Sequence, residues 1–177
     1  GDEWHGADGP LKLETGPASG PLFEAWLKSG PQAGYPLTDD VNGFSQEGFA
    51  VFDKNVVRGR RLSAARAYLH PVLDRKNLEV RTLANAERIV FADDRAVGVE
   101  YRRGRRNHTA LGSEIICCGG AFNSPQLLQL SGVGEPDHLG RVGVDVVAGV
   151  PGVGENLQDH LEVYIQHSCR EPVSMQP

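Results

Sequence analysis

The chain has 177 residues, of which 40% are hydrophobic and 23% charged, and its formal net charge is −5. This balance is typical of a folded globular chain and excludes a disordered one. The negative charge argues against general nucleic-acid binding, which requires a basic surface, and no apolar run is long enough to span a membrane. The first ten residues lack the charged and apolar regions of a secretory signal, so we expect a cytoplasmic location.

Two short helices are predicted in the first half of the chain, separated by segments rich in turn-forming residues. The apolar residues of "SGPLFEAWLKSG" (19–30) recur at helical spacing, and Pro31 is expected to end this helix early. A second helix is predicted in "RLSAARAYLHP" (61–71), where Ser63 is suited to cap the start and Pro71 to stop the helix.

Strand patterns follow in the middle of the chain. Two-residue alternation predicts a strand over 77–83 and a hairpin formed by 86–92 and 96–102. A polar tip then leads to a further strand at 108–112. The continuous apolar run at 113–118 is typical of a strand that is covered on both faces.

The three cysteines, Cys117, Cys118 and Cys169, do not form a disulfide framework, and we expect them to be reduced and mostly buried. No C-x-x-C motif and no His/Cys ligand spacing is present. The sequence therefore predicts no metal site.

The stretch "GGAFNSPQLLQLSGVG" (119–134) has two interpretations. Ser124 suits the N-cap of a helix, Pro125 its first position and Gly132 the residue after its end, and this arrangement needs no ligand. Alternatively, Gly119 and Gly120 would let a ligand approach the backbone, where free N–H groups of the following helix could face an anion. Local patterns leave both interpretations open.

Two further patterns have simple structural interpretations. The segment "GVPGVGENLQDH" (149–160) begins like a dinucleotide fingerprint, but Leu157 replaces the third glycine, so we expect a tight turn with Asn156 capping a short helix. The repeated letters "RGRR" occur at 58–61 and at 103–106. The second cluster lies at the predicted hairpin tip, where solvated arginines are the usual arrangement.

The stretch 119–134 resembles the second signature of the glucose-methanol-choline (GMC) oxidoreductase family, which runs Gly-Ala-x-x-Ser-Pro, two aliphatic residues, then Ser-Gly-aliphatic-Gly. Other segments resemble the same family and follow its order along essentially the whole chain: "HGADGPL" (5–11), "AGYPLTDDVNGFSQEGF" (33–49), "SAARAYLHP" (63–71), "NLEVRT" (77–82), "RAVGVEY" (95–101) and "VPGVGENLQDHLE" (150–162).

The resemblance implies an α/β chain of mixed α+β character. It would form part of a Rossmann-like FAD-binding domain with a β-meander, together with part of a substrate domain. Residues 1–60 would belong to the substrate side and residues 61–177 to the FAD-binding domain. The chain is then expected to be an internal segment of a longer enzyme.

The activity that the resemblance implies is FAD-dependent oxidation of an alcohol by hydride transfer to the flavin. The wording of "GENLQDHLEVYIQ" (154–166) is similar to that of choline-oxidising members, which favours conversion of choline to betaine aldehyde for glycine betaine synthesis. Oxidation of another alcohol, or a non-catalytic binding module, are the alternatives. The resemblance leaves open the electron acceptor and a peripheral attachment to the inner membrane.

Site residues follow from positions in the family's motifs. The G-x-G-x-x-G loop that holds the FAD pyrophosphate and the C-terminal catalytic histidine of the family have no match here, so no catalytic residue is assigned. Ala86 matches a position whose backbone meets the adenine, and Cys118 and Gly119 match a strand end close to the cofactor. Half of the cofactor shell would be missing, so this chain alone is expected neither to hold FAD tightly nor to oxidise choline.

Overall fold

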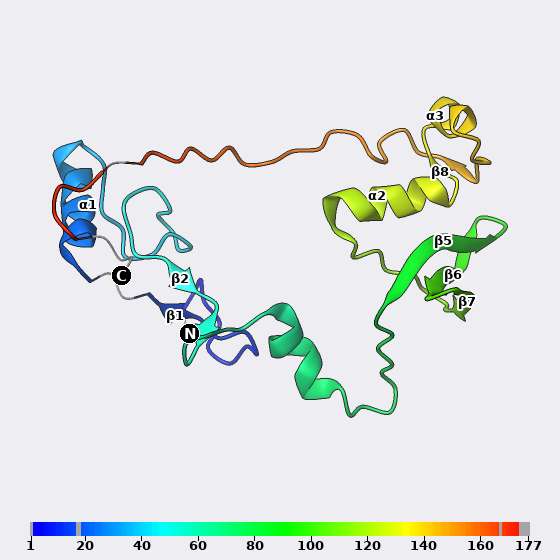
Figure 1. Ribbon diagram of the computed structural model, residues 1–177, viewed down its shortest axis with the longest axis horizontal. Helices are drawn as coiled ribbons and strands as arrows, with labels where there is room; N and C mark the ends of the chain where they lie inside the picture. The colour runs from blue at the N-terminus through cyan, green and yellow to red at the C-terminus, as the bar shows by residue number, and fades with distance from the viewer. Residues whose placement is uncertain (1, 17–18, 167, 174–177) are drawn as a thin grey trace. The chain divides into compact units, whose positions relative to one another are not determined.

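The computed structural model describes residues 2–16, 19–166 and 168–173. The chain divides into two compact units, one formed by Gly1–Val80 with Tyr164–Pro177 and the other by Arg81–Val163. Figure 1 shows the elements of each unit. None of the helices described is both long enough and apolar enough to cross a membrane. Which unit serves the substrate and which the cofactor stays a prediction.

Within its described residues, the first unit contains one regular helix, two very short strand pairs and two helical turns. These are α1 (Pro21–Gln32), β1 (Glu14–Thr15) antiparallel to β2 (Asp53–Lys54), β3 (Val56–Val57) antiparallel to β4 (Arg60–Arg61), the π-helical turn η1 (Ala65–Leu69) and the 3-10 turn η2 (His70–Val72).

Helix α1 confirms the predicted helix but continues through Pro31, so the expected early end is wrong. Proline in the last turn removes a single intrahelical donor, and the turn closes by other bonds. The N–H of Tyr35 donates to the carbonyl of Gly30 at 2.9 Å, and that of Gly34 donates to Pro31 at 3.1 Å. Gly34 adopts φ +87°, which completes a Schellman motif.

Gly30 lets an aromatic ring pack directly on α1. A Cβ at this position would lie 2.7 Å from Cγ of Phe49, so no larger residue fits without movement. The Phe49 ring lies 5.2 Å from that of Trp26 and 6.1 Å from that of Tyr35, between ring centroids. These three rings form an aromatic cluster on the buried Gly30, although Trp26 and Tyr35 stay largely exposed.

The second predicted helix is replaced by the consecutive turns η1 and η2. Ser63 is close to its expected role, because its Oγ accepts the N–H of Arg66 at 3.4 Å. Pro71 does not stop the helical path but lies inside η2. A proline is tolerated at the start of a new helical turn, where its missing N–H would have no partner.

The second unit is built on an antiparallel sheet in the order β5–β6–β7, followed by helices and a small parallel strand pair (Figure 1). Its elements are β5 (Ala84–Ala92), β6 (Arg95–Arg103), β7 (Arg106–Leu111), α2 (Gly120–Leu130), β8 (Val133–Gly134), α3 (Pro136–Arg141) and β9 (Ala148–Gly149). The predicted hairpin and third strand are confirmed, as is the mixture of helices and strands.

A β-bulge in β5 decides which side chains share a face. Ala86 pairs with Tyr101, but the next pair is Arg88 with Glu100, so one residue is left over. Strict alternation would place Arg88 on the same face as Ala84 and Ala86. The bulge instead moves Arg88 to the opposite face, where it forms an ion pair with Glu100 at 3.0 Å.

Two predicted strands are wrong. The segment 77–83 is irregular and ends in Leu83 at φ +55°, and the segment 113–118 is also irregular, with Ile116 76% exposed. A strand requires a neighbour whose N–H and C=O groups complete its hydrogen bonds. Among the residues described, neither segment has such a neighbour.

Helix α2 begins at Gly120, so the prediction that Ser124 caps its start is wrong. Ser124 lies inside the helix, and its Oγ accepts the N–H of Gly119 at 2.8 Å. The hydroxyl of Ser124, inside α2, thus forms a hydrogen bond with the N-cap residue, Gly119. At the other end Gly132 adopts φ +86° directly after the helix, as predicted.

Ser131 fastens the end of α2 to the outer edge of the sheet. Its Oγ accepts the backbone N–H of Ile89 at 2.8 Å and donates to the carbonyl of Leu127 at 2.5 Å. β5 is an edge strand, so the N–H of Ile89 points away from β6 and needs such an acceptor. Only 5% of Ser131 is exposed, which makes this a buried polar contact.

The turn predicted within 149–160 is present at Pro151–Gly154, but the helix expected after it is absent. Gly154 packs against α2, because the side-chain amide of Gln129 donates to the carbonyl of Val153 at 3.0 Å. Asn156 adopts φ +56°, a conformation that does not begin a helix.

Replacing Ser131 by alanine is expected to lower the free energy of unfolding by about 1–3 kcal/mol, because the buried N–H of Ile89 loses its acceptor. The matched control is Ser124→Ala, which frees an N–H that water can reach, and its cost should stay below about 1 kcal/mol. Urea unfolding monitored by circular dichroism measures both. Equal costs for the two variants would contradict a special role for Ser131.

Acidification is expected to weaken the start of α3. The carboxylate of Glu135 accepts the N–H of His138 at 2.5 Å and that of Asp137 at 3.1 Å. The bond from His138, and then that from Asp137, hold the pKa of Glu135 below its ordinary value. Because the pKa is lowered in the folded state, the stabilisation is complete above the unfolded pKa and is lost as the pH falls through the folded one.

The measurement is an NMR titration of the His138 amide. We expect its shift to move with a midpoint below the ordinary glutamate range, and Glu135→Gln should remove this step because an amide does not titrate. A wild-type midpoint at or above the ordinary value would contradict the cap.

Candidate functional site

A pocket of about 480 Å3 lies in the second unit between the sheet and α2. Its floor is formed by the start of β5 and by Val99 of β6, and its walls by the segment after β7 and the first turns of α2. The lining residues are Ala84, Asn85, Ala86, Val99, Ile115, Ile116, Cys117, Cys118, Gly119, Asn123, Ser124, Gln126, Leu127 and Leu130. This volume lies within the range of small-molecule sites.

The structure brings all three predicted cofactor-contact residues into this one pocket. Ala86 lies on β5, whereas Cys118 and Gly119 precede α2. The bond from the N–H of Gly119 to Ser124 holds the end of this segment against the helix. Whether these residues contact a cofactor stays a prediction, but their common location is a structural fact.

Several lining residues were not predicted. Asn123, Gln126 and Leu127 line the pocket from α2, and Asn85 lines it from β5. The spacing of Asn123, Gln126 and Leu127 at i, i+3 and i+4 is a helical stripe that the sequence contained. This stripe did not predict the pocket, because the helix was expected to begin only after Ser124, and Asn123 would then lie outside the helix.

The cysteines differ from their expected burial. All three are free thiols, but Cys118 and Cys169 are exposed and Cys117 is half-buried. Cys117 and Cys118 both line the pocket, because the segment that carries them is irregular and not a strand with opposite faces. Accessible thiols are therefore part of the candidate site.

No charged side chain lines the pocket. Its polar lining residues are Ser124 and three residues with amide side chains, and the remainder are the two cysteines, Gly119 and aliphatic residues. Neutral amides donate and accept hydrogen bonds at the edge of a ring, and the aliphatic walls suit its faces. The described residues contain no group of three or more His, Cys, Asp or Glu side chains that would hold a metal ion.

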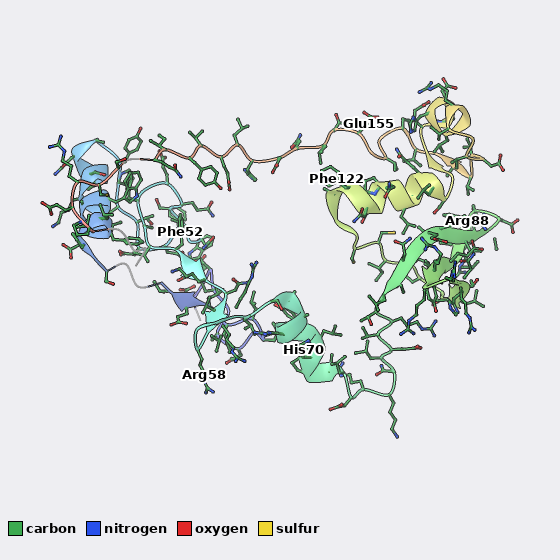
Figure 2. All side chains as sticks on the ribbon, viewed as in Figure 1. Phe52, Arg58, His70, Arg88, Phe122 and Glu155 are labelled. Atoms are coloured by element: carbon green, nitrogen blue, oxygen red, sulfur yellow. The ribbon has the colours of Figure 1, made fainter. Side chains whose placement is uncertain are left out.

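Gly119 and Gly120, at the start of α2, shape the pocket in two ways. A Cβ on Gly119 would lie 3.0 Å from Cβ of Asn123, so the absence of a side chain allows close packing on the first turn. Gly120 adopts φ +84°, which an L-residue with a side chain reaches only with strain. The bulky Phe122 projects from the same turn and is 74% exposed (Figure 2).

The charged face of the sheet lies outside the pocket. Arg88, labelled in Figure 2, forms its ion pair with Glu100, and Nε of Arg102 lies 2.6 Å from Oε1 of Glu87. The hydrogen bond from Arg88 to Glu100 raises the pKa of the guanidinium further above its already high value. These pairs stabilise the sheet without contributing to the pocket.

The second unit therefore has mixed α and β structure, with an uncharged pocket between a bulged edge strand and α2. Residues 4–162, which are nearly the whole chain, match the GMC oxidoreductase family. The chain belongs to the GMC oxidoreductase family.

Curated relatives with high identity carry one name. The chain is 54% identical over 176 residues to the oxygen-dependent choline dehydrogenase of Staphylococcus saprophyticus, which covers 99% of this chain and 31% of the relative. It is 55% identical over 176 residues to the protein of the same name from Staphylococcus aureus, with the same coverage. The chain thus spans about a third of the length of these relatives.

Solved structures support the same fold. An FAD-dependent oxidoreductase from Chaetomium thermophilum superposes with a TM-score of 0.82 at 29% identity, covering 87% of this chain and 27% of that one. A pyridoxine 4-oxidase from Mesorbium loti gives 0.75 at 31% identity, covering 83% and 29%. Both similarities agree with the expected mixed fold and indicate a flavin cofactor.

Proposed function

We propose that this chain is part of an enzyme that oxidises choline to betaine aldehyde, a step toward glycine betaine, with FAD as the hydride acceptor. The observation that carries the proposal is the identity of 54–55%, which extends over 99% of the chain, to relatives named oxygen-dependent choline dehydrogenase. Identity at this level over the whole chain supports a shared substrate, not only a shared fold. Oxygen, which the relatives' name includes, is the electron acceptor that we propose.

We further propose that the pocket beside α2 receives the adenosine half of the FAD. Its volume of about 480 Å3, its aliphatic walls and its neutral amides fit a flat heteroaromatic ring. Ala86 and Gly119 leave the approach to the backbone open, and Asn123 and Gln126 offer partners for ring-edge nitrogens. When bound, the flavin supplies the redox chemistry, and the residues of this chain hold and orient its adenosine end.

The residues that line this pocket act by binding the cofactor and not by transferring a proton. The pocket contains no histidine or carboxylate that could take a proton from an alcohol. We therefore assign no catalytic role to a residue of this chain. Its contribution is a fixed, mostly apolar wall that limits water around the cofactor.

A different alcohol is the second candidate. The pyridoxine 4-oxidase that shares this fold is 31% identical, which is too distant to decide the substrate but shows that related folds belong to oxidases of another alcohol. The identity to choline-oxidising relatives is higher by a wide margin, so choline is the first substrate to test.

The test is a substrate screen of the full-length protein purified with its flavin, using choline, pyridoxine and simple primary alcohols. Oxygen uptake and aldehyde formation are measured together. We expect choline to give the highest kcat/KM and peroxide to accompany the aldehyde. Preference for another alcohol would replace the substrate, and a colourless protein that binds no flavin would refute the proposal. The chain expressed alone should neither retain FAD nor oxidise choline.

The pocket itself is tested by filling it. Ala86→Trp places a large ring in the space assigned to the adenine, and we expect FAD affinity in the full-length protein to fall at least roughly tenfold, a loss of about 1.4 kcal/mol. The matched control, Ala92→Trp, changes an exposed alanine at the far end of β5. It should leave FAD affinity unchanged. Normal flavin retention by Ala86→Trp, measured by fluorescence titration of the apoprotein, would exclude this pocket.

A further inference from the structure

Two consecutive cysteines lie in the wall of the candidate pocket. Cys117 and Cys118 both line it, although neighbouring residues of a strand would point to opposite faces. Segment 113–118 is irregular, and this backbone allows both residues to reach one cavity. Both thiols are free, and Cys118 is exposed while Cys117 is half-buried. The pocket therefore presents two reduced thiols from adjacent positions of the chain.

The surroundings of these thiols suit a small neutral reagent. No charged side chain lines the pocket, whose volume is about 480 Å3. A neutral molecule such as hydrogen peroxide can enter it without the cost of desolvating a charge. A metal ion would need further ligands, and the described residues offer no group of three His, Cys, Asp or Glu side chains. The pair is therefore suited to thiol redox chemistry and not to metal binding.

The backbone that carries the pair is able to change shape. Among the described residues, segment 113–118 has no strand partner to hold it, and Gly119 and Gly120 follow it directly. A disulfide between consecutive residues is strained, because their Cα atoms are about 3.8 Å apart, whereas ordinary disulfides join Cα atoms about 4.4–6.8 Å apart. An irregular segment that ends in two glycines can accommodate this strain, and a strained disulfide is easily reduced again.

We propose that Cys117 and Cys118 form a peroxide-sensitive thiol pair, and that its disulfide form lowers the affinity of the pocket for flavin. This inference rests on the proposed function, which places the adenosine half of FAD in the pocket and makes oxygen the electron acceptor. Transfer of two electrons to oxygen gives hydrogen peroxide, so the enzyme itself produces the oxidant. Cys118 directly precedes Gly119, the N-cap residue of α2, so closure of the disulfide changes the pocket wall at the expected cofactor contact.

The oxidation consumes two thiols and one peroxide. Cys118, the more exposed residue, attacks one oxygen of the peroxide as its thiolate. An S–O bond forms, the O–O bond breaks, and the leaving hydroxide takes up the proton of the thiol to give water. The thiol of Cys117 then attacks the sulfur of this sulfenic acid. An S–S bond forms, the S–O bond breaks, and the hydroxyl group leaves with the proton of Cys117 as a second water. The two thiols lose two electrons, and the peroxide gains them.

Mass spectrometry of the full-length protein tests the oxidation. The flavin is removed, the apoprotein is treated with hydrogen peroxide, and the remaining thiols are alkylated before digestion. We expect the peptide that contains Cys117 and Cys118 to lose two hydrogen atoms and to escape alkylation, and dithiothreitol to restore both thiols. FAD added before the peroxide should slow this change because it covers the pocket. An unmodified pair, or equal oxidation rates with and without FAD, would overturn the inference.

Fluorescence titration then measures the effect on flavin binding. We expect the oxidised apoprotein to bind FAD roughly tenfold more weakly than the reduced apoprotein, and dithiothreitol to restore the affinity. In Cys118→Ser, peroxide should leave the affinity of that variant unchanged. Cys117→Ser should stop at a sulfenic acid on Cys118, which dimedone labels. The matched control is Cys169→Ser, which removes an exposed thiol outside the pocket and should respond to peroxide as the wild type does.

The outcomes separate this inference from the proposed function. An equal loss of affinity in peroxide-treated Cys118→Ser would show that oxidation elsewhere is responsible, and would overturn the inference. A protein that binds FAD equally well in both thiol states would overturn it while leaving the proposed function intact. A reduced apoprotein that binds no FAD would refute the proposed function and this inference together.

Discussion

The pocket depends on a single hydroxyl group that satisfies two backbone groups at once. Oγ of Ser131 accepts the edge N–H of Ile89 and donates to the carbonyl of Leu127 in the last turn of α2. An edge strand leaves backbone N–H groups without partners, and this hydroxyl supplies the acceptor for one of them. It also bonds to the carbonyl of Leu127, which accepts the N–H of Ser131 as well. Because the helix is fastened at its end, its first turns are held over the start of β5, and the space between them is the candidate cofactor site.

The parts of the fold that could be predicted from the sequence are those determined by neighbours in the chain. The hairpin of β5 and β6 follows from alternation on both sides of a tight turn, and Gly132 follows from the need for a positive φ after a helix. The segments 77–83 and 113–118 carry strand patterns of similar quality, yet neither is a strand. Their pattern describes which side chains favour burial, but only a pairing partner makes a strand, and no local feature reveals whether one is present.

The structure bears on only one of the two interpretations of the glycine pair, and the ligand interpretation stays a prediction. Ser124 does not cap the helix; it lies within α2, and its hydroxyl accepts the N–H of the N-cap residue Gly119. That bond occupies one of the donors that an anion would use, while Gly119 itself lines the pocket. The site is consequently better suited to a neutral ring than to a phosphate. Local sequence patterns could not predict that Ala86, Cys118 and Gly119 line one pocket, because these residues are far apart in the sequence. The resemblance to a family did predict a common site for them.

The bulge in β5 explains how the pocket stays free of charged side chains although the other face of the sheet carries ion pairs. With strict alternation, Arg88 would follow Ala84 and Ala86 onto the pocket face and bring a guanidinium group into the pocket. The extra residue at the bulge turns Arg88 to the other face, where Glu100 neutralises it, and places Ile89 where Ser131 can reach its N–H. One irregularity in the ladder therefore serves both the attachment of α2 and the neutrality of the site.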